Sequence, residues 1–196
     1  MQGKIKVTAG ILAGGKSQRM GRNKALLERG EENFLEHTVG LFDDFAQVLI
    51  SVDEQKKYKD TSYTFVCDDR KNYGPLEGLY QLRRQARYPW LFLVAVDMPL
   101  LSRQLLEKML EVDRQGVQAV ILRSSDGLHP LCGMYHQSVL PILEKMFQED
   151  IHKMNQFLEV IEVRTVEIME LGIKEETLVN INTPADYQWL EEYLNG

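Results

Sequence analysis

The chain has 196 residues, of which 44% are hydrophobic and 27% are charged, and its formal net charge is −6 at pH 7. This length suits one domain with a substantial core, so we expect residues 1–196 to form a single domain. The negative charge is spread along the chain, which argues against a protein that coats nucleic acid or a membrane surface but leaves room for an anionic ligand. The chain shows no signal-peptide core, no apolar run of membrane-spanning length and only two distant cysteines, so a cytoplasmic protein with reduced thiols is expected.

Short apolar runs alternate with amphipathic segments, which is typical of an α/β fold with a mostly parallel sheet. The strongest strand patterns cover residues 5–12, 47–52, 63–66, 90–96 and 117–122. Weaker patterns at 131–135 and 160–166 are compatible with an antiparallel edge strand, and a short strand is predicted at 178–181. Helices are predicted at 34–45, at 102–115 behind the N-cap Ser102, and from Thr183 onward.

Ligands of such sheets bind at the carboxyl ends of the strands, and the first strand leads into GILAGGKSQRMGRNK (10–24). Residues 10–17 match the P-loop pattern G-x-x-x-x-G-K-[ST], which binds nucleoside triphosphates. However, Ile11 and Leu12 extend the apolar run, whereas a P-loop begins its turn at the first glycine. Gly21 and Asn23 would each cost up to ~1 kcal/mol in the helix that a P-loop requires.

The sequence therefore predicts a long basic loop after the first strand. Adjacent glycines, Gly14 and Gly15, allow backbone N–H groups to approach phosphate oxygens. Cationic side chains would neutralise a polyphosphate; they are Lys16, Arg19, Arg22 and Lys24.

Two further strand ends carry carboxylates. The buried run FLVAV delivers Asp97 into a turn fixed by Pro99, and one carboxylate beside phosphates is the set that Mg²⁺ typically takes from a protein. Asp68 follows the strand pattern at 63–66, where it could accept hydrogen bonds from a ribose or from a guanine. Asp97 alone would also fit a P-loop protein, so it does not decide between the two kinds of phosphate site.

Five segments carry a resemblance to a known family. They are LAGGKSQRMGRNKALL (12–27), GPLEGL (74–79), AVDMPLL (95–101), HPLCGMY (129–135) and VNINTPADY (179–187). In this order they resemble the molybdenum cofactor guanylyltransferases, the MobA family of the nucleotidyltransferase superfamily. The resemblance covers about residues 5–190 and implies a Rossmann-like three-layer α/β/α fold. It also implies transfer of GMP from GTP to the terminal phosphate of molybdopterin, with release of pyrophosphate.

The resemblance assigns roles to individual residues. It implies that the backbone of Leu12, Ala13 and Gly14 contacts the nucleotide, that Lys24 holds the triphosphate, that Asp68 binds the nucleoside and that Asp97 binds Mg²⁺. Family members often carry a nucleotide-binding asparagine after the second strand, where this chain has Ser51 and Asp53 instead. No role is therefore transferred to those two positions.

The mechanism expected from these residues is in-line displacement at the α-phosphorus, without a covalent intermediate or a general base. Arg19, Lys24 and Asp97 are the candidate catalytic residues. The pterin is expected over the later strand ends, with His129, Asn180 and Asn182 as candidate contacts. Transient contacts with other cofactor-biosynthesis proteins or acceptor molybdoenzymes would follow from this role.

Other functions remain open at this stage. A sister nucleotidyltransferase could use CTP on molybdopterin, or another nucleoside triphosphate on a sugar phosphate or similar small acceptor. A P-loop GTPase switch and a nucleotide-binding protein without chemistry are the alternatives from other classes.

Overall fold

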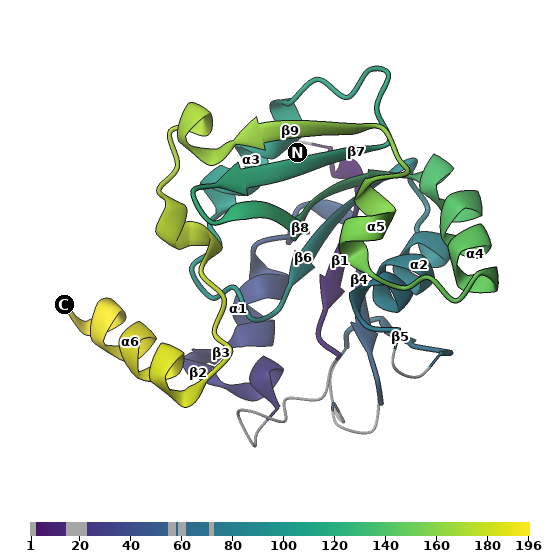
Figure 1. Cartoon of the computed structure of the whole chain (residues 1–196). Coiled ribbons are helices and arrows are strands. Elements are labelled where there is room, and N and C mark those ends of the chain that lie inside the picture. Colours follow the sequence, from purple (N-terminus) through teal and green to yellow (C-terminus); the bar gives the residue numbers. More distant parts are fainter. Residues whose placement is uncertain (1–2, 15–22, 55–57, 59–61, 71–72) are drawn as a thin grey trace.

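The computed structural model of the chain describes residues 3–14, 23–54, 58, 62–70 and 73–196. Its main sheet has seven strands in the order β5-β4-β1-β6-β8-β7-β9 (Figure 1). These strands are β1 (Ile5–Leu12), β4 (Phe45–Val52), β5 (Phe65–Cys67), β6 (Trp90–Ala95), β7 (Ala119–Ser124), β8 (Gly127–His136) and β9 (Val163–Glu167). Two short strands, β2 (Glu28–Arg29) and β3 (Glu32–Asn33), pair separately as an antiparallel hairpin.

Helices cover both faces of this sheet (Figure 1). One face packs against α1 (Phe34–Gly40) and α3 (Arg103–Glu111), and the other against α2 (Pro75–Gln85), α4 (Leu140–Gln148) and α5 (Met154–Leu158). The last helix, α6 (Pro184–Asn195), lies beside β2 and β3 in Figure 1, and its Leu190 joins the core of the first face. Short 3-10 helices lie between these elements, namely η1 (Lys24–Leu26), η3 (Gln137–Val139), η4 (Ile168–Leu171) and η5 (Glu175–Leu178). The predicted three-layer α/β/α fold is confirmed.

The central strand β6 shows why the sheet needs cover on both sides. Leu91 and Leu93 belong to one hydrophobic core and Phe92 and Val94 to the other, and all four are 0% exposed. Successive side chains of a strand point to opposite faces, so a run without polar residues must be buried twice. Each of these side chains contributes roughly 1.5–3 kcal/mol through burial.

The antiparallel strand lies in a different place from the one expected. β8 pairs antiparallel with both β6 and β7, so it is an interior strand, while the edge strand β9 runs parallel to β7. A tight hairpin joins β7 to β8 and places Gly127 at φ 113°, a conformation that favours glycine. The first half of β8, residues 127–131, is only partly buried, whereas Cys132, Met134 and Tyr135 are fully buried. The sequence pattern of the strand is therefore weak although the strand is interior.

Other boundaries also differ from the sequence prediction. The helix predicted at 34–45 ends at Gly40, and Phe45 already begins β4. Phe42 packs edge-on against Phe45 at 4.9 Å within a turn, so the apolar spacing there reflects core packing and not a helix. The segment predicted as a strand at 178–181 is the end of η5 followed by residues outside the sheet. Helices α4 and α5 were not predicted.

None of the helices in the described ranges is long and apolar enough to cross a membrane.

A close approach in β8 generates a test of the sheet packing. A Cβ atom on Gly133 would lie 2.7 Å from the carbonyl oxygen of Val120 and 2.8 Å from Cδ1 of Ile121. We expect Gly133→Ala to lower the free energy of unfolding by about 1–3 kcal/mol, because the backbone of β7 cannot move aside cheaply. Gly40→Ala is the matched control: its Cβ meets nothing within 4 Å, and alanine favours the helix by up to ~1 kcal/mol. Urea unfolding of both variants measures the difference; equal stability of Gly133→Ala and the parent would contradict the packing.

Candidate active site at the carboxyl edge of the sheet

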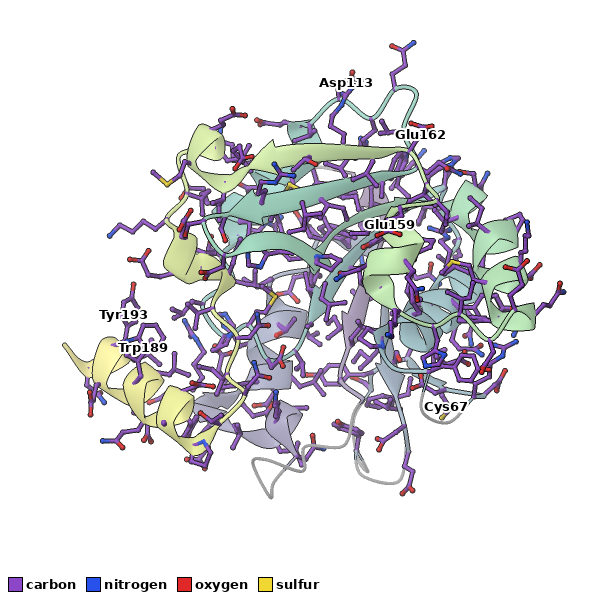
Figure 2. The ribbon with its side chains drawn as sticks, viewed as in Figure 1. Cys67, Asp113, Glu159, Glu162, Trp189 and Tyr193 are labelled. Atoms are coloured by element: carbon purple, nitrogen blue, oxygen red, sulfur yellow. The ribbon has the colours of Figure 1, made fainter. Side chains whose placement is uncertain are left out.

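The parallel strands bring the loops of the predicted site to one edge. Beyond the ladders, the N–H of Ala13 donates to the carbonyl of Ser51, and the N–H of Val96 donates to the carbonyl of Leu12. Asp68 continues the row, because its N–H donates to the carbonyl of Val52. The ends of β5, β4, β1 and β6 are therefore neighbours in that order, and Cys67 at the end of β5 marks this edge at the bottom of Figure 2.

The P-loop interpretation fails on the position of its first glycine. Gly10 lies inside β1 and pairs with Leu49 of β4 and Leu93 of β6, so the loop cannot begin there. After the loop, Asn23 is extended and caps the three-residue η1, so no α-helix runs from the loop through Asn23. The predicted phosphate-binding residues Gly15, Lys16 and Arg19, together with Arg22, lie outside the described residues.

Lys24, Asp97 and Asn182 form the centre of the site. The ammonium Nζ of Lys24 donates to Asp97 Oδ2 at 2.8 Å and to Asn182 Oδ1 at 2.6 Å. The side chains of Lys24 and Asp97 are only 18% and 21% exposed, so this ion pair is better shielded from water than a typical surface pair. Residues from three distant parts of the chain thus meet at one atom.

Each member of this cluster is held by its own local structure. Lys24 opens η1, where the side chain of Asn23 accepts a hydrogen bond from the N–H of Ala25. Asp97 follows β6, and its carbonyl accepts the N–H of Ile181 at 2.8 Å.

Asn182 stands just before the N-terminus of α6. Its N–H donates to Asp186 Oδ2 at 2.8 Å, within the capping box that Thr183 and Asp186 form. These backbone hydrogen bonds lower the pKa of Asp186, with the one from Asn182 as the largest cause. The ionised carboxylate of Asp186 in the first turn also interacts favourably with the helix dipole. This cap holds Asn182 in the position where it meets Lys24.

The donor set of this cluster fits a hard cation. A carboxylate oxygen and an amide oxygen converge on one cationic nitrogen, and both are the kind of ligand that Mg²⁺ takes. The described ranges contain no group of three or more His, Cys, Asp or Glu side chains that could hold a metal ion by themselves.

Asp68 occupies a more enclosed position. Its Oδ1 accepts a hydrogen bond from Ser51 Oγ at 2.9 Å. Burial raises the pKa of Asp68 from 3.8 to about 6, the Ser51 hydrogen bond opposes this shift, and the charge of Glu77 adds to it. Gly78 makes the arrangement possible, since a Cβ there would lie 2.8 Å from Ser51 Oγ and 2.4 Å from Cδ2 of Leu12.

A buried glutamate holds the loop that carries Asp68. Glu77 is 0% exposed and accepts hydrogen bonds from the N–H groups of Asp69 and Arg70 and from the side chain of Gln81. The guanidinium of Arg70 donates to Glu77 at 3.0 Å and lies over the ring of Phe147, 4.7 Å from its centroid. A paired and fully hydrogen-bonded buried charge of this kind orders the loop around it.

A tyrosine connects the described segments on either side of residues 15–22. The hydroxyl of Tyr58 donates to the carbonyl of Ala13, and Asn23 Nδ2 donates to the Tyr58 oxygen; both distances are 3.0 Å. Gly14 passes close to β4, since a Cβ there would lie 3.1 Å from the N of Asp53. The backbone of Leu12, Ala13 and Gly14 thus lies at the carboxyl edge of the sheet, next to β4 and Tyr58.

The candidate pterin residues follow along the same edge. His129 shares a hydrogen bond of 2.7 Å with Ser124 Oγ, and burial lowers the pKa of its ring. Ser125 donates to the carboxylate of Glu175 in η5, which ties the β7–β8 turn to the segment leading to Asn180. The side chain of Asn180 is turned to the carbonyl of Leu178, so of the three candidates it is Asn182 that the structure joins to Lys24.

A cavity of about 420 Å³ lies beside Lys24 in the chain, between η1, β2 and α6. Its walls combine apolar and polar side chains; they are Asn23, Leu26, Leu27, Glu28 and Tyr187. This volume falls within the range of small-molecule sites.

Comparison with known proteins agrees with this geometry. Residues 9–168 match the model of the MobA-like NTP transferase domain. The chain belongs to this family. It is 33% identical to a "probable molybdenum cofactor guanylyltransferase" of Carboxydothermus hydrogenoformans over 187 residues, which cover 94% of each protein. It is 28% identical to the molybdenum cofactor guanylyltransferase of Campylobacter jejuni over 91% of this chain and 92% of that protein.

Solved structures extend the comparison. The molybdopterin-guanine dinucleotide biosynthesis protein A of Archaeoglobus fulgidus aligns with a TM-score of 0.84 and 25% identity, covering 96% of this chain and 99% of that one. The 2-C-methyl-D-erythritol 4-phosphate cytidylyltransferase of Thermus thermophilus aligns with a TM-score of 0.73 and 20% identity over 98% and 100% of the two chains, which shows a shared fold. The protein is a nucleotidyltransferase of the MobA-like family.

Sequence reasoning missed two features of this site. The sequence assigns no role to Ser51, yet its hydroxyl holds the carboxylate of Asp68. The sequence also does not predict that Asn182 shares the ammonium of Lys24 with Asp97. The signal for Ser51 is its place between the apolar residues Ile50 and Val52. A lone hydroxyl inside a buried strand end needs a hydrogen-bond partner.

The raised pKa of Asp68 predicts a specific pH dependence of stability. The folded state binds the proton of Asp68 more tightly than the unfolded chain does. The protonated carboxyl therefore stabilises the fold fully below pH 3.8, and this stabilisation is lost as pH rises through about 6. Asp68→Asn removes this titration. The free energy of unfolding of Asp68→Asn, minus that of the parent, should therefore rise between pH 3.8 and about 6 and stay constant above it. Asp126→Asn, in the exposed turn between β7 and β8, is the control. Urea unfolding at a series of pH values measures the difference; a constant gap between Asp68→Asn and the parent would contradict the enclosed carboxyl.

Proposed function

We propose that this nucleotidyltransferase transfers GMP from GTP to the terminal phosphate of molybdopterin, releases pyrophosphate and forms the guanine dinucleotide of the molybdenum cofactor. We also propose that residues 1–196 act as one domain. The packing of Leu190 in α6 into the core that contains Phe92 and Val94 of β6 supports this. The observation that carries the function is the meeting of Lys24, Asp97 and Asn182 at the carboxyl edge. The names of relatives with 27–33% identity support the choice of substrates.

The nucleotide would lie along the ends of β1, β4 and β5. The backbone of Leu12, Ala13, Gly14 and Gly15 would contact it, and Lys16 and Lys24 would bind the triphosphate. Asp68 would accept hydrogen bonds from the nucleoside, and an acceptor is best when ionised, which its partner Ser51 favours.

Asp97 would hold Mg²⁺ beside the phosphates. The oxygen donors around Lys24 Nζ fit this role, and one protein carboxylate with substrate oxygens is an ordinary Mg²⁺ environment. Asp97 would hold the ion at this edge, where it would supply Lewis-acid stabilisation of the phosphate charge. The ammonium of Lys24 carries three donors, two of which the oxygens of Asp97 and Asn182 accept, so the third would bind the triphosphate.

The reaction is an in-line displacement that the protein's residues position. An oxygen of the pterin phosphate forms a bond to the α-phosphorus while the bond from that phosphorus to the bridging oxygen breaks, and the electron pair leaves with pyrophosphate. Lys24 and Arg19 would neutralise the charge that accumulates on the leaving group. The nucleophile is already ionised at neutral pH, so no residue needs to remove a proton.

The pterin would lie near His129, Asn180 and Asn182, toward the later strand ends. Transient contacts with other cofactor-biosynthesis proteins or acceptor molybdoenzymes are proposed from the product alone. A cytoplasmic location is proposed with them, and it agrees with Cys67 and Cys132 being free thiols.

Variants of the central cluster test the assignment. With GTP, Mg²⁺ and molybdopterin, Asp97→Asn should lower the rate of pyrophosphate release about 100-fold or more and leave GTP binding less affected. Lys24→Ala should weaken GTP binding by about 10-fold or more, because a charged hydrogen-bond donor is lost. Lys108→Ala, on the exposed face of α3, is the control for lost charge. Ser17→Ala should bind GTP normally; if it abolished binding while Lys24→Ala did not, a P-loop would be indicated.

Nucleotide choice separates the main proposal from its alternative. The same fold occurs in a cytidylyltransferase, so a transfer of CMP to molybdopterin is the second candidate. Purified protein should release pyrophosphate at least about 10-fold faster with GTP than with CTP, because one hydrogen-bonded contact to the correct base is worth roughly 1–3 kcal/mol. Faster release with CTP would overturn the guanylyl assignment, and release with a sugar phosphate but not with molybdopterin would overturn the acceptor.

A further inference from the structure

A second cavity lies at the opposite edge of the sheet. It measures about 290 Å³ and is lined by Trp90, Arg114, Gly116, Val117, Gln118 and His136. Trp90 is the first residue of β6 and His136 the last residue of the antiparallel β8, and the two are paired in the ladder. Asp97 lies seven residues after Trp90, so the cavity is about 20 Å from the central cluster. In Figure 2 the neighbouring Asp113 and Glu162 lie at the top, and Cys67 of the catalytic edge lies at the bottom.

The lining of this cavity offers cationic and donor groups. The guanidinium of Arg114 lies over the indole of Trp90, 5.5 Å from the ring centroid, and its Nη1 donates to the sulfur of Met134, a weak acceptor. No carboxylate lines the cavity among the described residues. The adjacent Asp113 is paired with Arg164 instead, at 2.7 Å.

His136 contributes a directed donor. Its Nδ1 accepts the N–H of Ser138 at 3.3 Å and lies 3.0 Å from Ser138 Oγ, so the neutral ring carries its proton on Nε2. Burial, together with the charge of Arg83, lowers the pKa of His136, which keeps the ring in that neutral form. In the part of the chain that the structure describes, Nε2 has no hydrogen-bond partner.

A buried arginine next to this corner adds charge, and none of the ion pairs among the described residues includes it. Arg83 is 2% exposed, and its Nη2 donates to the carbonyl of Tyr88, two residues before Trp90. Its Nε and Nη1 have no hydrogen-bond partner within the described residues. Burial lowers the pKa of Arg83 to about 10, which still leaves it charged at neutral pH. Unpaired buried charge is costly, so a negative group brought near this corner would be stabilised.

We propose that the cavity formed by Trp90, Arg114 and His136 is a binding site for a small organic anion, a carboxylate or phosphate monoester carried on one aromatic or apolar ring. The guanidinium of Arg114 and Nε2–H of His136 would bind the anionic group, and apolar atoms of Trp90 and Val117 in the lining would contact the ring. A volume of about 290 Å³ is close to the lower end of small-molecule sites, which suits a ligand with one ring. This site is independent of the proposed transfer reaction.

Trp90 itself can report binding. The chain has two tryptophans, and the other, Trp189, is 37% exposed on α6, so Trp189→Phe leaves Trp90 as the single fluorophore. This variant should be titrated with phenyl phosphate, benzoate and the neutral analogue phenol in a chloride buffer at neutral pH. We expect a saturable change in fluorescence with at least one of the two anions, and the stronger of them tells phosphate from carboxylate recognition. Phenol should bind at least about tenfold more weakly.

Four further variants in the Trp189→Phe background separate the cavity from general charge effects. Arg114→Met should weaken anion binding about tenfold or more, and His136→Asn should weaken it less, since Asn keeps an acceptor in the place of Nδ1 and loses the Nε2 donor. Lys145→Met, which removes an exposed cation of α4, should bind as the parent does. Arg114→Lys keeps the charge and should give an intermediate affinity, which preserves the test if Arg114→Met fails to fold. The absence of saturable binding, equal binding of phenol, or unchanged binding by both Arg114 variants would overturn the proposal.

Discussion

The contact of one ammonium with two oxygens unites the three parts of the chain on which the candidate site depends. Lys24 follows the first loop, Asp97 follows the central strand, and Asn182 precedes the last helix; Lys24 and Asn182 are 158 residues apart in sequence. Since the pair is largely shielded from water, loss of either partner would leave a poorly hydrated charge. The same contact positions a cation between a carboxylate and an amide, so the structure without ligands already shows where positive charge is stabilised at this edge.

This contact forms only because the sheet brings strand ends together with little tolerance. β6 is buried on both faces, so it cannot shift its register by one residue without moving Phe92 and Val94 into the wrong core. Gly14 and Gly78 then permit the approach of loop and helix to β4, where a Cβ would meet the backbone of Asp53 or the hydroxyl of Ser51. Rigid strands with small residues at their ends are a suitable support for a site whose chemistry depends on positioning.

The sequence predicts those parts of this arrangement that depend on residues close together along the chain. The bounds of β1 are predicted to the residue, and those of β6 to within one residue because its apolar run has no polar member. Ser102 and Thr183 are confirmed as caps. The interior position of β8 is not predictable in the same way, since the fully buried Cys132 and Met134 belong to a strand whose first half is only partly covered. Contacts between neighbouring strands, such as Ser51 with Asp68, require the register, which periodicity alone does not contain.

The two edges of the sheet differ in a way that follows from strand direction. The carboxyl edge collects Asp53, Asp68 and Asp97 and opposes them with Lys24, whereas the amino edge collects Arg83, Arg114 and His136 with no acid in the described lining of the cavity. β6 runs from one to the other as a fully packed strand, and a packed core transmits displacement but does not by itself create a second state. Coupling between the edges would need an element with two arrangements that both ligands bias. The described structure gives the amino-edge cavity its own walls and its own charge, and β6 is the strand that joins Trp90 in the cavity to Asp97 at the other edge.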